Sequence, residues 1–105
     1  MDQTFTLTEF ESLFMIHAAY SDYFFHENEK ELLQKWYDYE SFERIHTYYM
    51  ENKQSSFSFL IREFTKYYPQ KQSRELLMEK TVKVFYADGV FCDFEAYFKN
   101  FFAKI

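Results

Sequence analysis

Residues 20–29 read YSDYFFHENE, and residues 86–95, which lie 66 positions further along the chain, read YADGVFCDFE. Each segment is a short acidic turn between two stretches in which hydrophobic residues recur at helical spacing. Four of the ten positions are identical, and the pairs are Tyr20 and Tyr86, Asp22 and Asp88, Phe25 and Phe91, and Glu29 and Glu95. The repeat therefore predicts two similar helical hairpins in one chain.

The scarcity of turn-forming residues indicates the fold class. The chain has 105 residues but only one Gly and one Pro, whereas a sheet protein of this size needs tight turns repeatedly. A chain of this length can also bury a core of its own. We therefore predict an all-α fold in a single domain that spans residues 1–105.

Helical spacing of the hydrophobic residues predicts about six helices. They cover, approximately, residues 9–20, 27–37, 42–52, 57–68, 70–87 and the stretch from 93 to the C-terminus. Helices one and two form the first hairpin, and helices five and six form the second. We expect these hairpins to flank a central pair formed by helices three and four.

Cap and breaker residues place several of these boundaries. Thr8 followed by Glu11 has the spacing of a capping box and predicts the start of the first helix. Ser41 is of a cap residue type and directly precedes the third helix. The polar residues 52–56 predict a loop before the fourth helix, which Pro69 then ends.

The carboxylates of the acidic turns have two explanations. Glu29 and Glu95 lie three residues after the expected caps, where a carboxylate accepts the backbone N–H of the cap residue. Asp22 and Asp88 end the preceding helices, where a negative charge is unfavourable. Either an Asx turn offsets this cost, or each Asp joins the Glu seven residues later to bind Ca²⁺ or Mg²⁺. That spacing is not the spacing of an EF-hand loop, and both explanations stay open.

The second turn is the better candidate for such an ion. Gly89 follows Asp88 and suits the left-handed backbone conformation that often ends a helix. The first copy has Tyr23 at the equivalent position, where the same conformation is strained.

Residues 86–89, YADG, followed by Glu95 and with a weaker echo in the first segment, resemble the tellurite-resistance TerB-like family. The signature of that family is an Ala-Asp-Gly turn with a Glu seven residues after the Asp. The resemblance implies an all-α fold and divalent-cation binding by Asp88 and Glu95 and, in the first copy, by Asp22 and Glu29. It also implies a role in stress-related or membrane-associated assemblies rather than catalysis. The chain is short for this family and departs from its signature in the first copy, as expected for a divergent member.

Composition excludes several classes of partner. The formal net charge is −5, and no run of Lys or Arg forms a basic stripe for the phosphates of nucleic acid. No stretch approaches the ~18 apolar residues of a membrane span, and residues 1–11 are unlike a signal peptide. Cys92 is the only cysteine, which suits a reducing compartment. We expect a cytoplasmic protein that neither inserts into a membrane nor binds nucleic acid.

Aromatic residues make up a quarter of the chain, with 15 Phe, 10 Tyr and 1 Trp. Tyr48, Tyr67 and Tyr68 fall in the middle helix pair and predict a face for a protein partner or for a second copy of the chain. The alternative is that Phe fills the core and these tyrosines pack at its rim. His17 lies on the apolar side of the first helix, where we expect a hydrogen-bonded core histidine rather than a metal ligand.

The sequence carries no catalytic signature. It has no Gly-rich phosphate loop, no nucleophilic Ser motif and no carboxylate pair beside a credible substrate cleft. We therefore predict a small cytoplasmic helical protein-interaction module of TerB-like type that has no catalytic activity. The alternative is a protein that binds or senses Ca²⁺ or Mg²⁺ through the duplicated acidic turns.

Overall fold

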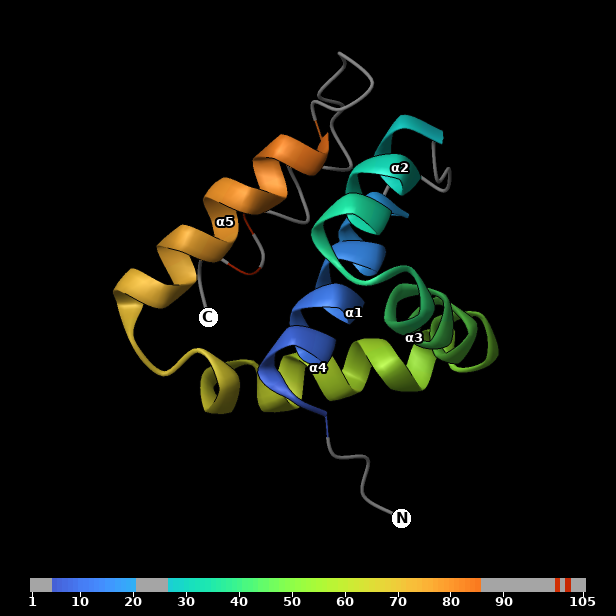
Figure 1. The fold of residues 1–105 in the computed structure, drawn as a ribbon. Helices are drawn as coiled ribbons and strands as arrows, with labels where there is room; N and C mark the ends of the chain where they lie inside the picture. Colours follow the sequence, from blue (N-terminus) through green and yellow to red (C-terminus); the bar gives the residue numbers. More distant parts are fainter. Residues whose placement is uncertain (1–4, 21–26, 86–99, 101, 103–105) are drawn as a thin grey trace.

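The structure is a computed structural model that describes residues 5–20, 27–85, 100 and 102 (Figure 1). Within these residues the chain forms five α-helices and no strand, which confirms the all-α class. The helices are α1 (Leu7–Ala19), α2 (Glu27–Trp36), α3 (Tyr39–Glu51), α4 (Lys53–Tyr67) and α5 (Lys71–Phe85). The second acidic turn and the predicted sixth helix lie outside the described residues, apart from Asn100 and Phe102, whose backbone is helical.

The helix at the centre of the described fold is α1, which packs against each of the other four. In Figure 1, α5 lies on one side of α1 and α2 and α3 lie on the other, while α4 crosses it. Nine of the 13 residues of α1 are buried. The expected central pair, α3 and α4, therefore lies beside the centre instead. The reason is that residues 13–19, LFMIHAA, are apolar on nearly every side of the helix, and such a helix must be buried all round.

A capping box starts α1, but at Thr6 rather than at the predicted Thr8. The Thr6 hydroxyl accepts from the backbone N–H of Glu9 at 3.1 Å, and the Thr6 N–H donates to Glu9 Oε1 at 2.9 Å. The spacing Thr-x-x-Glu occurs twice in this stretch, as Thr6 with Glu9 and as Thr8 with Glu11. With the cap at Thr6, Phe5 lies directly before the cap and its ring is buried. Glu11 then remains available for contacts inside the fold.

The starts of α3 and α4 also differ from the prediction. The Asp38 side chain, and not that of Ser41, caps α3 by accepting the Ser41 N–H at 3.3 Å. Polar residues 53–56 form the first turn of α4 instead of a loop. Most of them are exposed, so their polarity reflects a surface turn of the helix, whereas Ser56 is fully buried.

One hydrophobic cluster joins all five helices and Phe102. Phe14 packs on Phe64 with ring centroids 5.7 Å apart and on Phe102 with centroids 4.8 Å apart. On α5, Leu77, Thr81 and Val84 face this cluster and are at most 2 % exposed. Burial of each large side chain of this kind contributes roughly 1.5–3 kcal/mol. Many of the aromatic residues of the sequence thus fill the core.

Candidate functional site

Most residues predicted to hold a cation lie outside the described part of the chain. Asp22, Asp88 and Glu95 fall there, whereas Glu29 is described. Glu29 lies in the first turn of α2 and is 1 % exposed. Among the described residues, no group of three His, Cys, Asp or Glu side chains is placed to hold a metal ion. Cation binding therefore stays a prediction.

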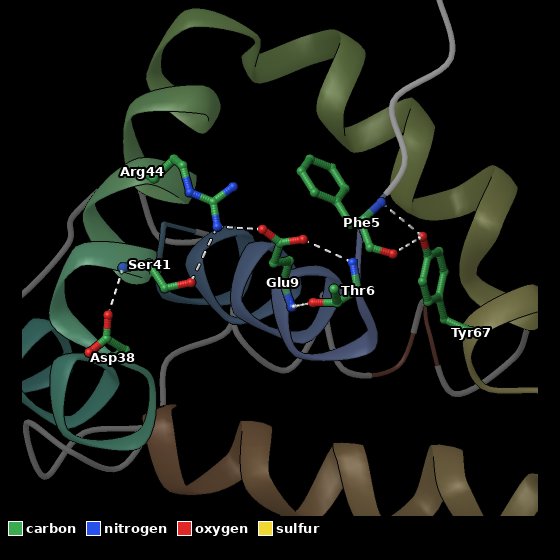
Figure 2. Close-up of polar contacts among 7 residues, drawn as sticks. All are labelled: Phe5, Thr6, Glu9, Asp38, Ser41, Arg44 and Tyr67. Carbon is green, nitrogen blue, oxygen red and sulfur yellow. Dashed lines mark hydrogen bonds and ion pairs between the residues drawn. The ribbon is translucent and has the colours of Figure 1, made fainter.

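Two of the tyrosines predicted to face a partner contact the chain's own Phe5. The Tyr67 hydroxyl donates to the Phe5 carbonyl at 2.7 Å and accepts from the Phe5 N–H at 3.3 Å (Figure 2). The ring of Tyr48 meets that of Phe5 edge to face, with centroids 5.3 Å apart. Tyr67 also stacks on Phe10 at 4.2 Å. These faces of the two tyrosines therefore pack against Phe5, as in the rim-packing alternative.

A second set of polar contacts fixes the start of α1 to α3. Figure 2 shows the guanidinium of Arg44 directed at Glu9, with which it forms an ion pair and a hydrogen bond. The backbone N–H of Thr6 and, to a smaller extent, Arg44 lower the pKa of the Glu9 carboxyl below its ordinary value of 4.5. Glu9 is therefore ionised at neutral pH and acts as a structural acceptor.

The third predicted tyrosine, Tyr68, is 5 % exposed and belongs to a cluster around Glu11. The hydroxyl of Tyr68 donates to Glu11 Oε1 at 3.4 Å, and that of Tyr37 donates to Oε2 at 2.6 Å. Lys80 Nζ donates to the same Oε2 at 3.1 Å. We call Glu11, Tyr37, Tyr68 and Lys80 the Glu11 cluster. One carboxylate thus ties α1 to α5 and to the residues that follow α2 and α4.

The sequence prediction assigned Glu11 to a helix cap and did not identify this role. A signal was present in the sequence, because two hydrophobic residues, Phe14 and Met15, follow Glu11 one helical turn further on, and the structure buries both. A carboxylate close to a buried face needs hydrogen-bond partners inside the fold. The sequence pattern does not show which residues supply them.

The two tyrosines of the Glu11 cluster are hydrogen-bond donors and not bases at neutral pH. Burial, and after it the neighbouring Glu11 carboxylate, raise the pKa of Tyr37 and the pKa of Tyr68 well above their usual value. A phenolate at either position would be desolvated and would lie against a negative charge. Both hydroxyls therefore keep their protons.

A hollow of about 460 Å³ lies over the Glu11 cluster, along one face of α5. We call it the α5 hollow, and the residues that line it include Glu11, Tyr68, Ser73, Leu76, Lys80 and Lys83. Leu76 is 57 % exposed, although it is a large apolar side chain. Lys80 leans over the ring of Trp36, with its Nζ 5.9 Å from the ring centroid. The hollow thus combines an exposed leucine with lysines and a carboxylate.

His17 is a core histidine, which confirms its prediction. It is 8 % exposed, and its Nε2 lies 2.8 Å from Ser56 Oγ. The Ser56 hydroxyl donates to the carbonyl of Lys53 at 3.1 Å, so it accepts from His17, and the imidazole carries its proton on Nε2. Burial lowers the pKa of His17 to about 3. The ring is neutral at physiological pH and serves as a donor between α1 and α4.

No protein-family model, curated protein or solved structure matches this chain. The TerB-like resemblance therefore rests on the sequence motif alone. Within the described residues, every helix is too short or too polar to span a membrane.

Proposed function

We propose that the chain is a small helical protein-interaction module that binds its partner at the α5 hollow. The observation that carries this proposal is the 57 % exposure of Leu76 on the wall of the hollow. Water around an apolar side chain on a concave surface is released when a partner covers it, and this release favours binding. A hollow of about 460 Å³ has room for a few side chains of such a partner.

The chemistry of the Glu11 cluster favours binding over catalysis. Its tyrosines keep their protons at neutral pH, and its carboxylate already accepts hydrogen bonds from three side chains. A general base needs a pKa near the working pH, and the pKa of each tyrosine lies well above it. In this proposal the cluster is a rigid floor for the docking site. The TerB-like resemblance supports the same choice, together with a cytoplasmic role in stress-related assemblies.

Affinity capture with matched variants tests this proposal. The full chain is immobilised as wild type, as Leu76→Glu and as Leu7→Glu, and the proteins retained from an extract of the source organism are quantified by mass spectrometry. Leu7 is a suitable control because it is another leucine at a helix surface, with 53 % exposure. We expect a partner that the wild type and Leu7→Glu retain and that Leu76→Glu loses at least tenfold.

Circular dichroism and thermal melting show whether each variant is folded. Equal retention by all three folded proteins would contradict docking at the α5 hollow.

A further inference from the structure

We propose that the partner at the α5 hollow is an amphipathic helix that carries an acidic side chain seven residues from its apolar anchor. This inference rests on the proposed function, since it names the class of partner for the same surface. It follows from the spacing and the charges of the α5 residues that line the hollow.

The lining residues of α5 form a helical ridge. Ser73, Leu76, Lys80 and Lys83 follow one another at steps of three and four residues, so they lie on one face of α5. From residue 73 to residue 83 this ridge is roughly 15 Å long at 1.5 Å per residue. A second helix packs along such a ridge with its own side chains in the adjacent groove. The described residues contain no strand edge that an extended peptide could join.

The lysines of the ridge differ in their pairing. Lys80 donates to Glu11 at 3.1 Å, and its charge is therefore already compensated. Lys83 is exposed and has no ion-pair partner among the described residues. A partner that brings a carboxylate to Lys83 gains an attraction that no described residue of the free protein supplies through an ion pair.

The charge of Glu79 fixes where that carboxylate can lie. Glu79 also lines the hollow, three residues after Leu76, and it repels an acidic side chain placed there. Lys83 lies seven residues from Leu76, which is roughly 10.5 Å along the helix axis. Because the net charge of the chain is −5, an acidic side chain of the partner is repelled at most other positions on the surface. A partner helix that runs along α5 must therefore space its apolar and acidic residues by about seven positions.

A phage-displayed library of single helices, randomised on one face, tests this inference with the full chain as the target. Helices are selected on the wild type, and those that still bind Leu76→Glu are removed. We expect the remaining helices to be enriched in Asp or Glu seven residues from an apolar residue. Their affinity for Lys83→Glu should fall about fivefold, and replacing the acidic residue of the helix by Lys should restore it. Lys66→Glu is the matched control, because Lys66 is an exposed lysine in the last turn of α4, as Lys83 is in α5.

The possible outcomes separate the two proposals. Helices that depend on Leu76 but show no acidic preference, or that bind Lys83→Glu and Lys66→Glu equally, would overturn the inference and leave docking at the hollow intact. A selection that yields no Leu76-dependent helix would count against the docking site itself, and the inference would fall with it.

Discussion

The hydroxyl of Tyr37 donates a 2.6 Å hydrogen bond to Oε2 of Glu11 and so joins the residue after α2 to the central helix. Tyr37 is 5 % exposed, and water cannot readily replace this bond. Removal of the Tyr37 hydroxyl takes away a charge-assisted hydrogen bond, which typically contributes about 1.5–3 kcal/mol. We therefore expect Tyr37→Phe to lower the free energy of unfolding by about 2 kcal/mol, as measured by urea denaturation.

Tyr39→Phe is the matched control for this measurement. Tyr39 lies two residues further along the chain and is 60 % exposed, so the loss of its hydroxyl should change the free energy of unfolding by less than about 0.5 kcal/mol. Equal effects of the two substitutions would mean that the bond to Glu11 adds nothing to stability.

The choice between Thr6 and Thr8 as the cap of α1 gives a second prediction. The Thr6 hydroxyl accepts the Glu9 N–H at 3.1 Å, whereas Thr8 lies inside the first turn of α1 and is exposed. Loss of a Thr cap costs about 1 kcal/mol. Thr6→Ala should therefore destabilise the protein by this amount, and Thr8→Ala should have little effect or slightly stabilise it because Ala favours helix. Thermal melting of the two variants distinguishes the two caps, and the reverse order of stability would support the cap predicted from the sequence.

The central parts of the helices could be predicted from the sequence because hydrophobic spacing is a local signal. The first helix was expected at about residues 9–20 and the second at 27–37, and α1 and α2 begin and end within two residues of these limits. Pro69 correctly placed the end of α4. The caps could not be predicted, because cap residues occur in pairs, Thr6 with Thr8 and Asp38 with Ser41. Tertiary contacts such as the burial of Phe5 favour one member of a pair.

The Glu11 cluster shows why the candidate site was harder to predict. Tyr37, Tyr68 and Lys80 are separated from Glu11 by 26, 57 and 69 residues. Their meeting depends on how α2, α4 and α5 are arranged around α1, which no local pattern specifies. His17 was easier, because a polar residue on an apolar helix face predicts burial by itself. Its partner Ser56, 39 residues away, lies in the stretch 52–56, which the sequence predicts to be a loop.

The buried histidine predicts a specific dependence of stability on pH. In the folded chain His17 stays neutral down to about pH 3, whereas in the unfolded chain it takes up a proton below its ordinary pKa of 6.5. Between these values the unfolded state binds more protons, so the free energy of unfolding falls as the pH falls. From about pH 7 to about pH 5 this one group should cost about 2 kcal/mol.

Urea denaturation of the wild type and of His17→Gln at both pH values measures this contribution. Gln can still donate to Ser56, but it does not titrate, so its stability should fall less with acidification. Both proteins keep His46, whose pKa burial also lowers, and its effect cancels in the comparison. Parallel losses of stability in the two proteins would show that His17 is not the group responsible.

Addition of Ca²⁺ or Mg²⁺ separates the proposed function from its alternative. An ion that binds only the folded chain stabilises it by about 2.7 kcal/mol at a hundred times its dissociation constant. For a domain of this size that corresponds to a rise in Tm of roughly 10 °C or more. As an interaction module, the chain should show a change below about 1 °C with about 1 mM of either ion, with EDTA as the reference. A rise in Tm that Asp88→Asn abolishes and that Asp38→Asn, which changes a described helix cap, leaves in place would instead establish a cation site at the second acidic turn.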